Sequence, residues 1–276
     1  MPMLKKFARK ILVEPLPPKL QLCFFRNYFY YCKKDYVKPE VDLFQKLSDP
    51  AKTTLDIGAN DGTYSMYLCR FAARLYCFEP LPWLVDGMKK KFRGTKNVTL
   101  ENCALGAQAE TATIRIPVTK SKRYDTRSSL AGSFDGQLIN GEKVLEIKEV
   151  KVAVKKLDDF RLENVGFIKM DVEGFELEAL KGARETILRN RPNLFIEIEQ
   201  RHHADMPITR IFEFIGQLGY AGYFQFENKF LPLAEFKAER HQSTAPDCPK
   251  DAYCGNFIFL PVSLAASRKK EIVGDV

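Results

Sequence analysis

The sequence predicts an α/β protein in which a seven-stranded sheet carries helices on both faces. The first observation is that, from residue 53 onward, apolar runs of strand length alternate with segments of helical pattern, as in parallel β-α-β units. The second is that two strand-like segments follow the last expected helix of the domain. This order predicts a sheet that closes with a pair of strands, unlike an all-parallel dinucleotide-binding sheet.

The composition agrees with a globular fold. Of the 276 residues, 45% are hydrophobic and 28% are charged, which excludes a disordered tail protein, a collagen-like fibre and a small disulfide scaffold. No apolar run approaches the ~18 residues needed to span a bilayer. The net charge of +8 favours anionic partners without naming one.

Each expected strand of the main sheet is a short apolar run, and most are followed by an expected helix. One of these helices is expected to begin at Pro82, because proline is well tolerated in a first helical turn. Residues 111–118 and 144–154 alternate in period two, which predicts a further pair of strands, and the polar residues 119–141 between them predict a mobile loop. The strands of the main sheet are expected at residues 54–57, 74–78, 98–104, 167–170, 193–198, 223–226 and 257–260, and the helices at residues 63–71, 82–92, 174–189 and 209–218.

Three regions are expected along the chain: a basic, aromatic N-terminal arm or helical region over residues 1–50, an α/β domain over residues 51–262 and a tail over residues 263–276. Residues 1–38 contain nine basic but only two acidic residues, interleaved with aromatic ones. This pattern favours contact with a membrane surface or a polyanion. It is equally typical of a solvated face whose aromatic residues pack on the main domain. The apolar run at residues 11–13 is too short for a secretory signal, and prolines follow it.

The seven cysteines form an odd set without closely spaced pairs, which predicts buried thiols in a reducing compartment. The expected location is therefore the cytoplasm, with peripheral contact to the inner face of the membrane through residues 1–38 as an open alternative. Cys248 and Cys254 could form a disulfide or half of a zinc site, although their spacing matches no common zinc pattern.

The most informative stretch is residues 55–62, in which an apolar strand runs into a glycine-rich turn and then into a helix. Gly58 and Gly62 let the backbone pass close to a ligand, and the start of the following helix offers unpaired N–H groups. The Gly-x-x-x-Gly spacing does not complete the fingerprint of nicotinamide cofactors. A purely structural turn is an alternative for this stretch alone.

An acidic residue at the end of the next strand strengthens the prediction of a nucleotide-type site. Glu79 follows the apolar run 75–78 and precedes Pro80, which ends the strand. A carboxylate at this position can accept hydrogen bonds from both ribose hydroxyls of a cofactor that contains adenosine.

Several motifs together resemble the FkbM family of S-adenosylmethionine-dependent methyltransferases. They are LDIGANDG, FEP, ENCALG, IKMDVEGFELEALKGA and PNLFIEIE, which occur in this order over residues 53–200. The resemblance implies a seven-stranded, Rossmann-like class I methyltransferase fold in residues 51–262. It also implies transfer of a methyl group to a hydroxyl oxygen, often on a sugar or a macrolide.

The resemblance also implies roles for particular residues in binding S-adenosylmethionine. The glycine turn would surround the methionine part, Glu79 would bind the ribose, and two residues after the third strand would lie beside the adenine. The residues of the turn are Asp56, Gly58, Asn60, Asp61 and Gly62, and the two beside the adenine are Asn102 and Ala104.

The candidate catalytic residues follow two later strands. Asp171 and Glu173 come directly after the strand that ends at Met170, at the edge where open α/β sheets bind ligands. They could remove the proton of an acceptor hydroxyl or hold the substrate, but they could also cap the helix that follows. Lys169 could bind an anionic substrate group or pair with a neighbouring carboxylate.

A second polar cluster follows the strand over residues 193–198. Glu197 and Glu199 point to the same side if the strand continues, and His202 and His203 are two of the three histidines in the chain. An imidazole is the usual proton acceptor near neutral pH, so Glu197 and His202 join the catalytic candidates. Carboxylates with histidine could also bind a divalent metal. The spacing is no metal signature, so no metal ligands are assigned, and simple solvent exposure of the histidines is the alternative.

The sequence therefore favours an S-adenosylmethionine-dependent O-methyltransferase that acts on a hydroxyl of a sugar, glycolipid or other small molecule. An RNA methyltransferase is an alternative suggested by the basic arm, but nucleic acid is disfavoured because no Asn/Asp-Pro-Pro-aromatic string occurs. A nicotinamide dehydrogenase is disfavoured by the incomplete glycine fingerprint. A non-enzymatic membrane-surface protein that keeps a cofactor pocket is the remaining alternative.

Overall fold

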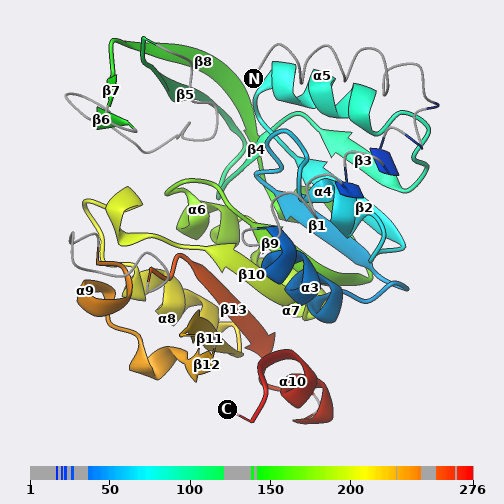
Figure 1. Ribbon diagram of the computed structural model, residues 1–276, viewed down its shortest axis with the longest axis vertical. Coiled ribbons are helices and arrows are strands. Elements are labelled where there is room, and N and C mark those ends of the chain that lie inside the picture. Colours follow the sequence, from blue (N-terminus) through cyan, green and yellow to red (C-terminus); the bar gives the residue numbers. More distant parts are fainter. Residues whose placement is uncertain are drawn as a thin grey trace.

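The computed structural model describes residues 37–120, 138–139, 142–227, 229–243, 253–264 and 266–275, with six separate positions between residues 17 and 27 (Figure 1). Within these residues the chain forms a large central sheet, a long two-stranded ribbon beside it, and helices on both faces of the sheet. Most of residues 1–38 and most of the expected loop 119–141 lie outside the described residues.

The central sheet has eight strands in the order β12-β11-β13-β10-β9-β1-β2-β3. The five strands from β10 to β3 are mutually parallel, whereas β13, β11 and β12 pair antiparallel. The α/β fold and the antiparallel closing strands are thus confirmed. The strands are β1 (Thr53–Ile57), β2 (Arg74–Phe78), β3 (Val98–Glu101), β9 (Val165–Met170), β10 (Asn193–Glu197), β11 (Tyr220–Phe226), β12 (Lys229–Pro232) and β13 (Asn256–Pro261).

The expected count of seven strands is wrong, because β12 adds an eighth at the edge of the sheet. This strand has only four residues, and each of them is exposed or half-buried. It therefore lacks the buried apolar run by which the other strands are recognised. In contrast, all five residues of β1 are buried, as expected for a strand covered on both faces.

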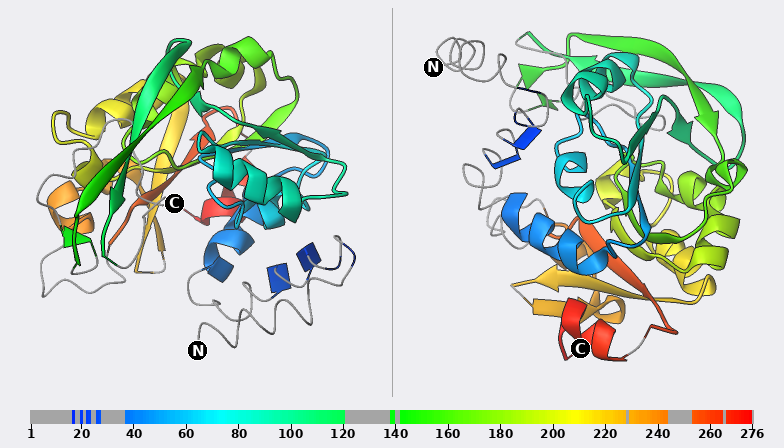
Figure 2. Two further views of the ribbon diagram at one scale, coloured as in Figure 1. Left: turned by 90° about the horizontal axis from the view of Figure 1, so that it is seen from above. Right: turned by 90° about the vertical axis from the view of Figure 1, so that its right-hand side faces the viewer.

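Two hydrophobic clusters cover the opposite faces of the sheet. One contains residues of α6 (Glu176–Lys181), α7 (Arg184–Asn190) and α8 (Thr209–Gln217). The other contains residues of α3 (Val37–Leu47), α4 (Ser65–Leu68), α5 (Pro82–Lys91) and α10 (Ala266–Val273). The helices on both faces are visible in Figure 2 and confirm the expected layers.

The single helix expected over residues 174–189 is wrong, since the chain forms α6 and α7 with a break at Gly182 and Ala183. A Cβ atom on Gly182 would lie 1.9 Å from the carbonyl oxygen of Gly106. The break thus follows from close packing against a segment distant in sequence. The strand expected over residues 98–104 is also divided, because β3 ends at Glu101 and Ala104–Leu105 (β4) joins another sheet.

The other sheet is the ribbon of β5 (Glu110–Val118) and β8 (Glu146–Lys155), with β4 beside β8. Both long strands were expected, and they pair antiparallel from Glu110 opposite Val154 to Val118 opposite Glu146. In Figures 1 and 2 the ribbon extends beyond the central sheet. Two short strands, β6 (Leu138–Ile139) and β7 (Glu142–Lys143), also pair with each other. The single helical turn η3 (Leu157–Phe160) follows β8.

Helix α3 packs on the central sheet, although it lies within the expected N-terminal arm. The ring of Phe44 is fully buried, with centroid distances of 4.9 Å to Phe195 and 5.8 Å to Phe167. The guanidinium of Arg268 on α10 donates to the carbonyl oxygen of Ser48, just after α3, at 3.3 Å. The boundaries at residues 50 and 262 stay a prediction, as does membrane contact through residues 1–38.

The described cysteines and helices bear on two further expectations from the sequence. Five described cysteines (23, 69, 77, 103 and 254) are free thiols, while Cys248 lies outside the described residues. Where the structure describes the chain, no helix is long and apolar enough to cross a membrane. The remaining short elements are η4 (Gln200–His202), η5 (Leu233–Glu235) and α9 (Ala238–His241).

Replacement of Phe44 by alanine should lower the free energy of unfolding by about 3–5 kcal/mol, because it leaves a cavity between α3 and the sheet. Urea denaturation of the full chain measures this loss. Leu145→Ala is the control: its side chain is 66% exposed, so the change should stay within about 0.5 kcal/mol. Equal small losses in both variants would show that α3 contributes nothing to the folded domain.

Candidate active site

The glycine turn after β1 is pressed against the end of β9. Gly58 has a φ of +75°, and a Cβ atom there would lie 1.8 Å from the carbonyl oxygen of Asp171. Its N–H donates to the carbonyl oxygen of Phe78 at 3.0 Å. The turn therefore requires glycine at this position both for its backbone conformation and for space.

Glu79 organises the same turn from the end of β2. One carboxylate oxygen accepts the N–H of Asn60 at 2.8 Å and the other accepts the N–H of Leu81 at 2.9 Å. Burial raises the pKa of Glu79 to about 7, although these two backbone hydrogen bonds act in the opposite direction. A carboxylate has about four lone-pair sites, so each oxygen can still accept a hydrogen bond from a ligand.

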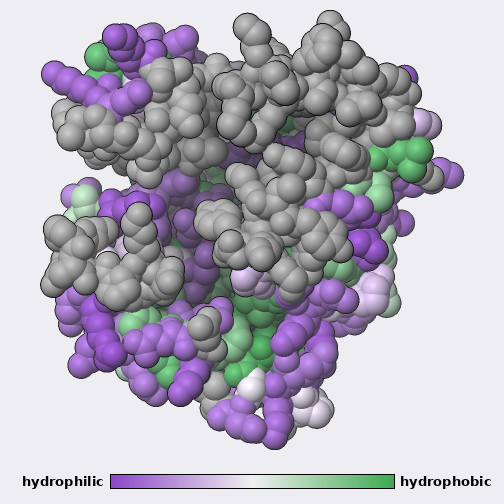
Figure 3. Space-filling view, in the orientation of Figure 1, coloured by the Kyte–Doolittle hydropathy of each residue, from purple (hydrophilic) through white to green (hydrophobic). Residues whose placement is uncertain are grey.

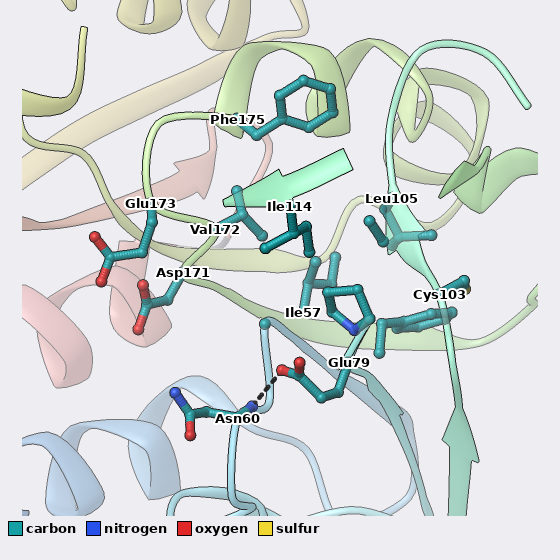
Figure 4. A pocket seen from close by; sticks show the side chains of 14 residues that line it. Ile57, Asn60, Glu79, Cys103, Leu105, Ile114, Asp171, Val172, Glu173 and Phe175 are labelled. Atoms are coloured by element: carbon teal, nitrogen blue, oxygen red, sulfur yellow. Dashed lines mark hydrogen bonds between the residues drawn. The ribbon is translucent and has the colours of Figure 1, made fainter. Parts of the chain in front are cut away.

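These residues border a pocket that encloses about 650 Å³ of space, part of it open to solvent. Figure 4 shows Glu79 at its base, bonded to Asn60, with Asp171 and Glu173 side by side on another wall. The apolar part of the lining comes from Ile57, Phe78, Leu105, Ile114 and Phe175. Of the expected cofactor residues, Gly58, Asn60, Glu79 and Ala104 line the pocket.

The other four expected cofactor residues lie around the pocket lining. Asp56 is fully buried behind the turn, and burial raises its pKa. Asp61 accepts the N–H of Thr63 at 2.9 Å on the exposed side of the turn. A Cβ atom on Gly62 would contact side chains of α5 and the residue after it. Asn102 donates to the carbonyl oxygens of Glu79 and Pro80, at 2.9 Å each, and so holds the backbone of Glu79.

Asp171 and Glu173, which directly follow β9, form the acidic wall of the pocket. Burial raises the pKa of Glu173 to about 8, and Asp171 and Glu199 add to this shift. Glu173 also has a φ of +51°, which is uncommon for a residue with a side chain. Neither Asp171 nor Glu173 occupies the cap position of α6, because that helix starts at Glu176 after Phe175. The capping alternative is therefore wrong.

The last residue of β10 and the segment after it supply the rest of the cluster. Burial raises the pKa of Glu197, and the charges of Asp171, Glu199 and Glu173 raise it further. The Nε2 atom of His202 lies 3.2 Å from a carboxylate oxygen of Glu173 and 3.5 Å from one of Glu199. Of the four expected catalytic residues, Asp171 and Glu173 line the pocket, whereas Glu197 and His202 lie outside its lining. The catalytic roles of all four stay a prediction.

The two adjacent histidines have different surroundings. Burial lowers the pKa of His202, which favours its neutral form beside the carboxylates. His203 is buried and its Nε2 atom lies 2.7 Å from a carboxylate oxygen of Glu176. The alternative of plain solvent exposure is therefore wrong for His203.

Lys169 is the buried cation of the site. Its Nζ atom lies 3.6 Å from Oδ1 of Asp56 and 3.5 Å from Oδ2 of Asp171. The expected pairing with a neighbouring carboxylate is confirmed. The sequence reasoning missed Glu40 on α3, which accepts hydrogen bonds from Tyr64 and from the Asn256 amide. No motif surrounds Glu40, and only the packing of α3 places it here.

A metal site is the remaining question about these side chains. Among the residues that the structure describes, no group of three or more His, Cys, Asp or Glu is arranged to hold a metal ion.

Comparisons with known proteins identify the family of the chain. The family model described as "Methyltransferase FkbM domain" matches residues 56–221. Methyltransferase sdnD of Sordaria araneosa is 28% identical over 48% of this chain and 60% of its own length. 2-O-methyltransferase NoeI of Sinorhizobium fredii is 25% identical over 61% of this chain and 73% of its own length. The chain thus spans about three fifths of the first of these curated relatives.

Among solved structures, methyltransferase FkbM from Methylobacillus flagellatus KT aligns with a TM-score of 0.47 and 17% identity, covering 91% of this chain and 58% of that chain. An α/β sheet with a pocket at the carboxyl ends of its parallel strands is an architecture that methyltransferases share with many other enzymes. The extent of the family match shows that the chain belongs to the FkbM methyltransferase family.

Replacement of Gly58 by alanine should lower the free energy of unfolding by at least about 2 kcal/mol, because the new methyl group collides with the backbone at Asp171 and the positive φ is strained. Chemical denaturation measures the loss. Gly87→Ala is the matched control, since no atom lies within 4 Å of a Cβ atom there. That helical substitution should raise stability by up to about 1 kcal/mol. A Gly58 variant as stable as the parent would contradict the described turn.

Proposed function

We propose that the protein transfers the methyl group of S-adenosylmethionine to a hydroxyl oxygen of a sugar or a related small molecule. The observation that carries this proposal is the pocket in which Glu79 lies across from Asp171 and Glu173. One end offers a carboxylate to a ribose, and the other offers carboxylates to an acceptor hydroxyl. The similarity to a 2-O-methyltransferase supports an oxygen acceptor.

The residues of the pocket fit the chemistry of S-adenosylmethionine. Glu79 keeps acceptor sites for two ribose hydroxyls, and the apolar side chains of Ile57, Leu105 and Phe175 suit the faces of an adenine ring. The carboxylates of Asp171 and Glu173 give the other end a negative potential, which complements a positively charged sulfonium. When bound, the cofactor supplies a methyl group that is already activated.

The contribution of the protein is then to align the reactants, exclude water and accept a proton. Alignment of two reactants can supply a large part of the barrier reduction. Asp171 is held by Lys169 and faces the pocket. Glu173 lies beside it and contacts His202, so a proton taken from the acceptor oxygen can be held on the Glu173 carboxylate and shared with the imidazole.

Glu79→Gln should weaken binding of S-adenosylmethionine by about 1.5–3 kcal/mol, the range for hydrogen bonds to a charged group. The substitution keeps the size of the side chain but exchanges one acceptor oxygen for an NH₂ group. Isothermal titration calorimetry measures the affinity. Asp86→Asn, at the exposed ion pair of Asp86 with Lys89, is the control and should bind the cofactor like the parent. Unchanged affinity in the Glu79 variant would contradict the proposed contact between Glu79 and the ribose.

Turnover should increase as the pH rises through about 8, because Glu173 accepts a proton only when it is ionised and its pKa is raised to about 8. The effect on stability has the opposite sign. The folded protein holds this proton more tightly than the unfolded chain, so the stabilisation present below pH 4.5 is lost as the pH rises to about 8.

A pH series of turnover at saturating cofactor and acceptor measures this effect in the parent and in Glu173→Gln. The variant should lose most of its activity, and its residual rate should no longer rise near pH 8. If the variant kept the full rate and the pH profile of the parent, another group would act as the base.

A further inference from the structure

A second pocket lies between α3 and the antiparallel strands of the sheet, and it is called here the α3 pocket. Its polar lining consists of Glu40, Gln225, Glu227, Tyr253 and Asn256. The pocket encloses about 830 Å³ of space, part of it open to solvent.

The α3 pocket opens at the same edge of the sheet as the candidate active site. Glu197, the last residue of β10, pairs directly with Asn256, the first residue of β13. On the other side of β13, Phe224 pairs with Phe257, so Gln225 follows at the level of Asn256. Glu197, Asn256 and Gln225 therefore lie at the same level on three neighbouring strands, at one edge of the sheet.

The two pockets share no described lining residue, and contacts of Glu40 connect the α3 pocket to Lys169. The Asn256 side-chain amide donates to a carboxylate oxygen of Glu40 at 3.1 Å. Burial raises the pKa of Glu40, whereas Lys169 lowers it and Asp171 raises it again. Lys169 also forms the ion pair with Asp171 in the active-site pocket. Glu40 also accepts a hydrogen bond from Tyr64, whose ring centre lies 5.5 Å from the Lys169 ammonium. A ligand in the α3 pocket that extends past Glu40 toward Lys169 would therefore approach the methyl-donor site.

The lining of the α3 pocket indicates the chemistry of its ligand. Its described polar residues are two carboxylates, two amides and a phenol, with no lysine, arginine or histidine among them. Such a set can bond to several hydroxyl groups but repels phosphate and carboxylate groups. The apolar part of the lining comes from Leu43, Phe195, Phe230 and Ile258, which suits the C–H face of a sugar ring. Figure 3 shows hydrophobic residues gathered at the lower centre of this face, with hydrophilic residues around them.

We propose that the α3 pocket holds the methyl acceptor as an uncharged glycosyl unit and excludes phosphorylated and carboxylated sugars. The inference rests on the proposed function and adds to it the place and the charge of the acceptor. It also gives α3 a part in acceptor recognition through Glu40. Gln225 and Glu227, which are exposed at the rim of the pocket, then contribute to specificity rather than to the fold.

Saturation-transfer NMR tests the proposal with the full chain and S-adenosylhomocysteine. The probes are the methyl α-pyranosides of glucose, mannose and galactose at millimolar concentration, together with glucose 6-phosphate. We expect at least one neutral glycoside to bind and the phosphate to remain unbound. Gln225→Ala should weaken glycoside binding about tenfold, the effect of one lost hydrogen bond. Gln217→Ala is the matched control, because this exposed glutamine lies on α8 and outside the pocket lining.

A second variant, Glu40→Gln, tests the α3 side of the pocket, with its melting temperature measured to confirm folding. Weaker glycoside binding in the folded variant supports the proposal. Three results would overturn it: no neutral glycoside binds, glucose 6-phosphate binds more tightly, or Gln225→Ala binds like the parent. Calorimetry with S-adenosylhomocysteine separates the two proposals. If the parent protein does not bind S-adenosylhomocysteine, the proposed function is contradicted, whereas the α3 pocket is tested by glycoside binding.

Discussion

The buried ammonium group of Lys169 is the contact on which the arrangement of the site depends. Lys169 on β9 is in register with Asp56 on β1, and its Nζ atom lies within 3.6 Å of that carboxylate and 3.5 Å of Asp171. Burial alone would lower the pKa of Lys169, but Asp171 and Asp56 raise it above its ordinary range, so the group stays charged. An unpaired charge at this depth would cost several kcal/mol. The buried Lys169 and Asp56 therefore stabilise each other, and Lys169 also holds the partly exposed Asp171 carboxylate at the end of β9.

Most of the main sheet could be predicted because its central strands β1, β9, β10 and β13 are almost fully buried and form short apolar runs in the sequence. The elements that were missed depend on contacts between segments distant in sequence. The break between α6 and α7 occurs where Gly182 meets the backbone of Gly106, and no local pattern shows that contact. Helix α3 lies within the expected arm or helical region of residues 1–50, but the burial of Phe44 in the core was not predicted. The edge strand β12 is short and partly exposed, so it has no clear hydrophobic signal.

The same distinction holds for the residues of the site: some were predictable from the local sequence, and others are brought together only by long-range packing. Glu79 and Asp171 were predicted from their positions at strand ends, and both line the pocket. The Asn102 amide donates to the carbonyl oxygen of Glu79 and is absent from the pocket lining, and its expected place beside the adenine stays a prediction. Glu40 and Asn256, which are hydrogen-bonded at 3.1 Å, are far apart in sequence. Their meeting depends on how α3 packs across the antiparallel strands, which neither composition nor motif reveals.

The pocket between Glu79 and Asp171 should bind the methyl donor with its sulfur toward the acidic wall. A crystal structure of the protein with S-adenosylhomocysteine would reveal this placement. We expect both ribose hydroxyls to lie within hydrogen-bond distance of the Glu79 carboxylate, with the sulfur directed toward Asp171 and Glu173. A ligand bound elsewhere, or one whose ribose makes no contact with Glu79, would contradict it.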